Sequence, residues 1–321
     1  MTNWKIYDPA LPAADQPVSL PPAPPWRRPG AAREAVLAQT FRPDPALVDA
    51  VNTALYLRRP LLLTGRPGTG KSALVHAVAH QLGLGQVIEW AVNSRSTLQE
   101  GLYHYDALAR LQYVQQAQAR AGKGGTTSEE DELGMFLTLG PLGTALASAH
   151  SPRALLVDEI DKSDVDLPND LLNVLDTGHF VIPELKRAAK AYPTVTIPGR
   201  GNEPITVHGG EITFTEYPFV VMTSNGERDF PAPFLRRCVQ CQIREPDETA
   251  LTAIVQAHFE GLPANEELQA IVREFVQRRA SVSLATDQLL NAVHLLLNAG
   301  AKRSEAERER VVNAVFQGLG G

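Results

Sequence analysis

Residues 60–82 read PLLLTGRPGTGKSALVHAVAHQL, so that an apolar run, a glycine-rich loop and an apolar helical pattern follow one another directly. The loop at residues 65–72 fits the pattern G-x-x-x-x-G-K-[ST] at every defined position. Glycines let such a loop wind tightly, so that backbone N–H groups and the positive end of the following helix face phosphate oxygens. The stretch therefore predicts a nucleotide site between a strand and a helix.

Side chains of this loop have distinct expected roles. Lys71 supplies a cation to the β- and γ-phosphates, and the Ser72 hydroxyl coordinates Mg²⁺. We therefore expect ATP and Mg²⁺ as cofactors. The nucleotide-binding residues that we predict are Gly65, Arg66, Pro67, Gly68, Thr69, Gly70, Lys71, Ser72 and Ala73.

Two further apolar runs end in polar residues that suit phosphoryl chemistry. ALLVDEIDK, residues 154–162, places Asp158 at the carboxyl end of a buried strand, where ligands of open α/β sheets bind. Asp158 is expected to hold Mg²⁺ directly or through water, and Glu159 to polarise the attacking water. In VMTSNG, the Asn225 amide could bridge the γ-phosphate and that water. Chance acidity at a strand end and helix capping by Asn225 are the structural alternatives.

Apolar runs alternate with helical patterns through the first two thirds of the chain. Runs that are apolar on both faces predict a parallel sheet covered by helices on both sides, and hence an α/β fold. They begin near Pro60, Gln86, Ala154, Pro218 and Val239. From Asp247 onward the apolar residues recur at helical spacing, which predicts a compact all-helical domain.

These patterns divide the chain into three predicted parts. Residues 1–40 form an N-terminal arm and linker, of which residues 9–30 are proline-rich and are expected to be extended, without a core of their own. Residues 41–246 form the nucleotide-binding core, and residues 247–321 form the helical domain. Within the core, residues 120–134 have the composition of an exposed loop, and residues 186–218 predict an insertion with a β-hairpin built from TVTI and PITV.

The order of these motifs resembles that of the AAA+ ATPases. More narrowly, DEIDKSDVDLPNDLLNVLDTGHFVIPEL, the hairpin insertion and SNGERDFPAPFLRRC resemble the MoxR-like branch from about Phe41 to the C-terminus. The resemblance implies a parallel sheet of order 5-1-4-3-2, a helical lid over bound ATP, and a homo-oligomeric ring, usually a hexamer. It also implies chaperone-like remodelling or activation of a client or adaptor protein, often one with a von Willebrand factor A domain.

The resemblance gives the stretch FLRRC a role in a neighbouring subunit. An arginine before the last core strand commonly completes the next subunit's nucleotide site, and Arg237 matches that position best, with Arg236 assisting or pairing with an acid. Two surface arginines are the alternative. The lid departs from the pattern, because Ala285 and Thr286 stand where many AAA+ proteins carry an arginine. Arg278 and Arg279 lie just upstream at a different spacing.

Several other residues have a structural interpretation that we weigh above a functional one. Cys238 and Cys241 lie in a strand-like pattern with no second cysteine pair, which favours buried packing over zinc or redox chemistry. His76 and His80 share a helix face but lack the glutamate of a zinc protease. The segment with Tyr103, Tyr105 and Arg110 suits either core packing or a pore or partner contact.

Composition excludes some classes of function and leaves others open. The net charge of −6 gives no global reason to bind nucleic acid, and no run of about 20 apolar residues could span a membrane. With two cysteines and no secretory leader, we expect a cytoplasmic protein. Two rival functions remain: a nucleotide-dependent scaffold with weak hydrolysis, and a nucleic-acid motor or loader. A defence system would be indicated by a nuclease encoded nearby.

Overall fold

The computed structural model describes residues 6, 18–28, 30–121, 133–148, 151–259, 261–298 and 305–317. The chain divides into two compact units. The sheet unit comprises residues 45–64 and 79–242, and the helical unit comprises residues 1–44, 65–78 and 243–321. The predicted domain boundary between residues 246 and 247 stays a prediction.

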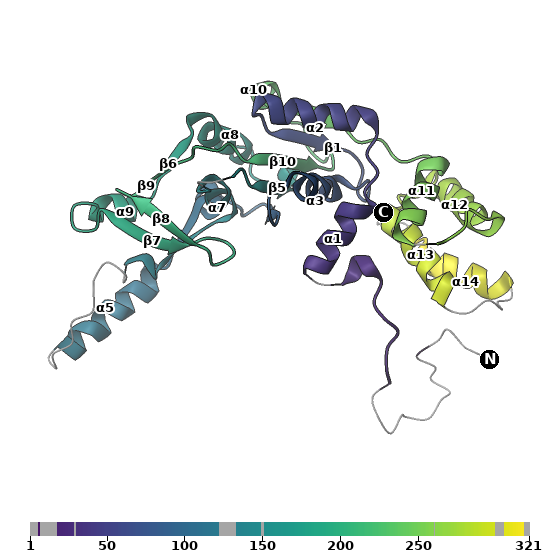
Figure 1. Ribbon diagram of the computed structural model, residues 1–321, viewed down its shortest axis with the longest axis horizontal. Coiled ribbons are helices and arrows are strands. Elements are labelled where there is room, and N and C mark those ends of the chain that lie inside the picture. The colour runs from purple at the N-terminus through teal and green to yellow at the C-terminus, as the bar shows by residue number, and fades with distance from the viewer. Residues whose placement is uncertain are drawn as a thin grey trace. The chain divides into compact units, whose positions relative to one another are not determined.

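The sheet unit is built on a five-stranded parallel sheet (Figure 1). Its strands run in the order β11-β1-β10-β5-β2, which confirms the predicted order 5-1-4-3-2. Their bounds are β1 Leu61–Thr64, β2 Ile88–Ala91, β5 Ala154–Asp158, β10 Phe219–Ser224 and β11 Val239–Gln242. The α/β fold with a parallel sheet flanked by helices is therefore confirmed.

The burial of the central strands explains why apolar runs in the sequence predict their positions. All six residues of β10 are buried, as are the first four of β5, because helices cover both faces of the sheet. Helix α2, Pro45–Leu57, contacts β1 and β11 through a stripe that includes Leu47, Val51 and Ala54. This helix begins at Pro45, and proline suits the first position of a helix because its backbone nitrogen carries no hydrogen to leave unpaired.

The strand register brings the carboxyl ends of β1, β10, β5 and β2 to one edge of the sheet. Thr64 of β1 is the register partner of Ser224 in β10, while Met222 is the partner of Val157 in β5. Asp158 is in turn the partner of Ala91 at the end of β2. The polar ends of β5 and β10 are therefore adjacent, although 64 or more residues separate them in sequence.

Two smaller antiparallel sheets complete the sheet unit. One pairs β3, Tyr103–Tyr105, with β4, Leu137–Leu139. The other has the order β6-β9-β8-β7, with bounds His179–Val181, Glu211–Thr213, Pro204–His208 and Thr194–Pro198. The pairing of β7 with β8 confirms the predicted hairpin. Most of the loop predicted at residues 120–134 lies outside the described residues.

Helices connect the strands of the sheet unit. Besides α2 they are α4 Leu98–Leu102, α5 Ala107–Ala121, α7 Pro141–Leu146, η2 Ile160–Lys162, α8 Leu167–Thr177, α9 Pro183–Ala188 and α10 Ala232–Arg237. Helix α7 is buried at all six positions. Helix α8 buries Leu171 and Leu175 and ends at Gly178, whose φ of 73° suits a glycine at a helix terminus.

The C-terminal part of the helical unit contains the four helices that the sequence predicts (Figure 1). These are α11 Glu248–His258, α12 Glu266–Arg279, α13 Thr286–Asn298 and α14 Glu305–Val315. Asp247 and Asn265 cap α11 and α12 by accepting backbone N–H groups from Ala250 and Leu268. Apolar side chains at helical spacing, among them Leu251, Val255, Phe275 and Leu289, form its core.

The N-terminal segment differs from the extended arm without a core that its prolines predict. Pro25–Arg27 forms a 3-10 helix, η1, and Ala31–Thr40 forms helix α1. The Trp26 side chain is only 8% exposed and joins the core of the helical unit, while its indole N–H donates to Asn291. Burial of a large aromatic ring whose polar group finds a hydrogen-bond partner stabilises this arrangement. Residues 7–17 and 29 of this segment lie outside the described part.

Candidate functional site

The glycine-rich loop lies in the helical unit and leads into helix α3, Lys71–Leu82. Gly68 and Gly70 have φ of +76° and +88°, a conformation that other residues rarely adopt. Around Gly68 the backbone is also crowded, because an added Cβ would lie 2.3 Å from the Cβ of Ala285. These contacts explain why the loop requires glycine at residue 68.

Lys71 lies inside the curve of this loop. Its side chain is buried, and Nζ donates to the carbonyl oxygens of Gly65 at 2.6 Å and Arg66 at 3.0 Å. Ser72 and Ala73 follow as the next two residues of α3, both half-buried. A cation and a hydroxyl at the N-terminal turn of a helix are the groups that a nucleotide phosphate with Mg²⁺ requires.

The other predicted residues of the loop lie towards its exposed side. Arg66 and Pro67 are exposed, and Arg66 forms an ion pair with Glu245 at 3.1 Å. The Thr69 hydroxyl donates to the carbonyl of Arg66, which closes the loop on itself. The residues present therefore fit a nucleoside triphosphate, and the Ser72 hydroxyl is a hard oxygen ligand of the kind that Mg²⁺ prefers.

At the carboxyl edge of the sheet, Thr223 joins Asp158 to the backbone of Glu159. The Thr223 hydroxyl donates to Oδ1 of Asp158 at 2.5 Å and accepts the N–H of Glu159 at 2.9 Å. Thr223 is completely buried within β10. The hydroxyl thus fixes the orientation of the Asp158 carboxylate and the position of the Glu159 backbone.

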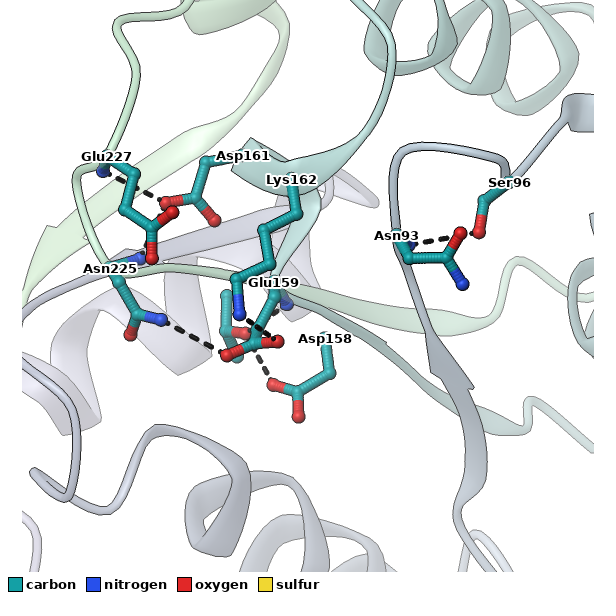
Figure 2. A network of polar contacts seen from close by, with 9 residues as sticks. Asn93, Ser96, Asp158, Glu159, Asp161, Lys162, Asn225 and Glu227 are labelled. Carbon is teal, nitrogen blue, oxygen red and sulfur yellow. Dashed lines mark hydrogen bonds and ion pairs between the residues drawn. The ribbon is translucent and has the colours of Figure 1, made fainter.

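Glu159 leaves the strand in an unusual conformation. Its φ of 58° and ψ of 47° are left-handed, and such strain in a residue other than glycine is typical of functional sites. Its carboxylate accepts from Lys162 Nζ at 2.8 Å and from Asn225 Nδ2 at 3.2 Å (Figure 2). The hydrogen bond with Glu159 raises the pKa of Lys162, so the ammonium stays charged.

Asn225 lies on the loop after β10 and does not cap a helix. The next helix, α10, begins at Ala232 with Pro231 as its N-cap. Instead, the Asn225 amide faces Glu159, and its backbone N–H donates to Asp161 at 2.9 Å (Figure 2). The structure therefore brings Asp158, Glu159 and Asn225 together, as expected for residues that act on one reacting group.

Arg236 and Arg237 are both exposed near the end of α10. Arg237 contacts α8, because Nε lies 3.4 Å from a carboxylate oxygen of Asp176 and Nη1 donates to Asn173 at 3.0 Å. The backbone carbonyl of Arg236 accepts a hydrogen bond from the Arg59 guanidinium. Within one chain, therefore, Arg237 is held on the surface of the sheet unit by two residues of α8.

The arginines upstream of α13 are engaged within the helical unit. Arg278 pairs with Glu274 at 2.7 Å and lies over the Phe316 ring. Arg279 donates to the carbonyl of Pro246 and pairs with Glu245. The residue that reaches the glycine-rich loop is Ala285, whose methyl group borders Gly68.

The remaining candidates Tyr103, Tyr105, Arg110 and Cys238 lie in the sheet unit, and packing stays an interpretation of their role. Tyr103 is buried, which raises its pKa to about 12 with help from the nearby Glu184 carboxylate, and the Tyr105 hydroxyl accepts from Arg110. Cys238 is a buried free thiol, and burial raises its pKa to about 12. Within the described residues, no three His, Cys, Asp or Glu side chains are grouped to hold a metal ion.

We call the group of polar residues around Asp158, Glu159 and Asn225 at the carboxyl edge of the sheet the acidic edge. Four of its residues were not among those that the sequence predicts: Thr223, Asp161, Lys162 and Arg228. The Glu159–Lys162 pair has the i, i+3 spacing of a helical ion pair, a signal that the sequence does contain. The contacts of Thr223, Asp161 and Arg228 join segments 64 to 66 residues apart, so only the strand order could have located them.

A parallel sheet with this strand order, a glycine-rich loop after β1 and a carboxylate pair after β5 defines a P-loop nucleotide-binding protein. Residues 60–238, more than half of the chain, match the family model of the AAA domain, dynein-related subfamily. The chain therefore belongs to this AAA family, whose members generally hydrolyse ATP and commonly form rings. No curated protein matches the chain. Across the described residues, no helix has both the length and the apolarity to cross a bilayer.

Proposed function

We propose that the chain is an ATP- and Mg²⁺-dependent AAA+ motor of the MoxR-like branch. It hydrolyses ATP at the interfaces of a homo-oligomeric ring, a hexamer in the usual family arrangement, and uses the energy to remodel or activate a client protein. The family match supports an ATPase in general. The branch assignment is supported by the β7–β8 hairpin before β10 and by the stretch SNGERDFPAPFLRRC.

The observation that carries the proposal is the position of the Glu159 carboxylate. It lies beside Asp158 at the carboxyl edge of the sheet, with the Asn225 amide at 3.2 Å (Figure 2). The Glu159 carboxylate is held by hydrogen bonds next to Asp158, the proposed metal ligand. In this position it can orient and deprotonate an attacking water. A purely structural acid would need neither the strained backbone nor the neighbouring amide.

In this proposal each residue of the site has a separate role in hydrolysis. Lys71 and the backbone N–H groups of residues 65–73 bind the phosphates, and Ser72 and Asp158 hold Mg²⁺. Glu159 takes the proton of the attacking water, and Asn225 orients that water against the γ-phosphate. Since Lys162 forms an ion pair with Glu159 at 2.8 Å, the carboxylate must exchange this partner for water before it can act as a base.

Arg237 completes the proposed site from a neighbouring subunit. Its contacts with Asp176 and Asn173 are exposed and can be replaced at little cost. An arginine that reaches the γ-phosphate of the next subunit makes hydrolysis depend on assembly, and such a residue raises the rate by about 10³ or more. Arg236 is proposed to assist at the same interface.

A second function, a nucleotide-dependent scaffold with weak hydrolysis, is favoured by one observation. The lid residue that borders Gly68 is Ala285, while Arg278 and Arg279 are paired elsewhere in the helical unit. The lid then offers a methyl group where a guanidinium would sense the γ-phosphate. Turnover that a client protein stimulates would separate a motor from a scaffold.

The proposal is tested by Mg-ATP turnover and ATP binding in the wild type and in Glu159→Gln and Lys71→Ala variants. Glu159→Gln keeps the shape of the side chain but removes the base, so we expect at least a ~100-fold loss of turnover with ATP binding retained. Lys71→Ala should lose binding itself. Removal of Mg²⁺ with EDTA should abolish turnover, and added Mg²⁺ should restore it.

Arg110→Ala is the matched control, because it removes one side-chain hydrogen bond to Tyr105 elsewhere in the sheet unit. It should hydrolyse ATP like the wild type. A Glu159→Gln variant that turns over ATP at the wild-type rate would show that Glu159 is not the base.

A further inference from the structure

A second set of contacts at the acidic edge joins the loop after β10 to the segment after β5. The loop comprises residues 225–228, and the facing segment comprises η2 and residues 163–164. The two segments are linked from both sides: a side chain of η2 binds the loop backbone, and a side chain of the loop binds the backbone after η2. Asp161 and Arg228 provide these two side chains.

Asp161 is a buried carboxylate, 5% exposed, that binds backbone N–H groups. Its Oδ2 accepts from Asn225 at 2.9 Å and from Glu227 at 3.1 Å (Figure 2). Its Oδ1 is buried and has no hydrogen-bond partner among the residues that the structure describes. Burying a carboxylate with one unpaired oxygen costs free energy, which suggests that the hydrogen bonds of its other oxygen have a role. Here these bonds hold Asn225 and Glu227, the two residues on either side of Gly226.

Arg228 closes the loop from the opposite direction. Its Nη1 donates to the carbonyl of Ser163 at 3.0 Å, and its Nη2 lies 3.4 Å from the carbonyl of Asp164. The planar guanidinium can reach two neighbouring carbonyl groups at once, which the single ammonium of a lysine does with less precision. The loop is therefore fixed at residues 225, 227 and 228, with only Gly226 between these points.

From these contacts we propose that Asp161 and Arg228 are positioning residues that hold the Asn225 amide against the Glu159 carboxylate. Thr223 fixes the Glu159 side of the pair, and the clamp of Asp161 and Arg228 fixes the Asn225 side. The inference rests on the proposed ATPase function, because the pair matters only if Glu159 activates water. The clamp acts through Asn225, so neither residue contacts the reacting atoms.

A general role in stability is the competing explanation, and the kinetic constants separate the two. Loss of position at Asn225 should lower kcat by about tenfold while the KM for ATP stays within about twofold, since the phosphate loop is unchanged. A loss of folded protein would lower the active fraction and shift the unfolding midpoint instead. The variants are Arg228→Ala, Arg228→Lys and Asp161→Asn, with Arg110→Ala as control.

The conservative variants make the test sharper. Arg228→Lys keeps one donor and should recover part of the lost kcat, and Asp161→Asn keeps an acceptor oxygen but lacks the charge. Arg228 is partly exposed, so its variants should fold even if Asp161→Asn does not. Amide hydrogen exchange of the nucleotide-free protein provides a measurement that is independent of turnover: exchange at residues 225–228 should accelerate in Arg228→Ala, but not in Arg110→Ala.

The outcomes distinguish this inference from the proposed function. If the wild type shows no Glu159-dependent hydrolysis, both are overturned. If hydrolysis depends on Glu159, but Arg228→Ala has wild-type kcat and unchanged exchange in the loop, only the clamp is overturned. A selective loss of kcat with faster exchange at residues 225–228 supports it.

Discussion

At the scale of single residues, the acidic edge depends on one buried hydroxyl. Thr223 both donates to Asp158 and accepts from the N–H of Glu159, so it links the proposed metal ligand to the proposed base. Replacing it with valine keeps the shape but leaves both partners without this bond. An unsatisfied buried polar group costs about 1–3 kcal/mol, a large share of the stability of a domain.

Thr223→Val is therefore expected to lower ATP turnover by about tenfold and to destabilise the sheet unit by about 1–3 kcal/mol. Thr223→Ser is the matched control, because it retains the hydroxyl and should keep most of the activity. Steady-state kinetics and chemical denaturation measure the two effects. Equal activity of the valine and serine variants would mean that the hydroxyl does not orient Asp158 or Glu159.

At the scale of elements, the glycine-rich loop and the start of α13 constrain each other within the helical unit. A Cβ on Gly68 would lie 2.3 Å from the Cβ of Ala285, and φ there is +76°. Gly83 offers a matched comparison, since its φ is +66° and an added Cβ would meet no atom of the described residues within 4 Å. The two positions share the backbone strain but differ in crowding.

Gly68→Ala should weaken ATP binding by at least about tenfold, because the loop must move away from its phosphate-binding shape. Gly83→Ala should cost only about 1 kcal/mol of stability and leave ATP affinity unchanged. Equilibrium titration with a fluorescent ATP analogue measures both variants. Similar affinities in the two would show that the contact with Ala285 does not shape the loop.

The packing of Trp26 makes the helical unit sensitive to pH. Trp26 contacts the rings of His258 and His294, each with a centroid distance of 5.7 Å. Burial lowers the pKa of both histidines, and the nearby Arg42 lowers that of His258 further. Each ring is therefore held neutral in the folded protein at a pH where the unfolded chain would begin to bind a proton.

Because the folded pKa values lie below the unfolded value of about 6.5, their contribution to stability is complete above that pH and is lost as the pH falls through the folded values. Hydrogen exchange in α11 and α13 should therefore accelerate as the pH falls below about 6.5, after correction for intrinsic exchange. The double variant His258→Gln with His294→Gln should lose most of this dependence. An unchanged pH dependence in that variant would assign it to other groups.

At the scale of the whole molecule, the fold was predictable where local patterns determine it. Five apolar runs became the parallel strands, of which β1, β5 and β10 are buried on both faces, and the capped periodic segments after Asp247 became helices. The N-terminal segment was not predictable in the same way. Its prolines predict an extended chain, while the burial of Trp26 depends on α11 and α13, more than 200 residues away.

The candidate site follows the same division. The glycine-rich loop, Asp158, Glu159 and Asn225 could be located because each follows an apolar strand. The roles of Thr223, Asp161 and Arg228 could not, because their partners come from segments that are adjacent in space and distant in sequence. The functional roles of all these residues stay proposals.

The central claim, hydrolysis at a site shared between subunits, is tested most directly by mixing two inactive variants. Arg237→Ala retains the phosphate loop, and Lys71→Ala retains the proposed arginine finger. With random neighbours, an equimolar mixture places one complete site at about a quarter of the interfaces of a ring. ATP turnover per subunit is measured against protein concentration for the wild type, each variant and the mixture.

The account predicts that wild-type turnover per subunit rises with concentration, that each variant alone is inactive, and that the mixture recovers about a quarter of the wild-type rate. Wild-type turnover by Arg237→Ala at every concentration would contradict it, and would identify Arg237 as a surface residue that contacts α8.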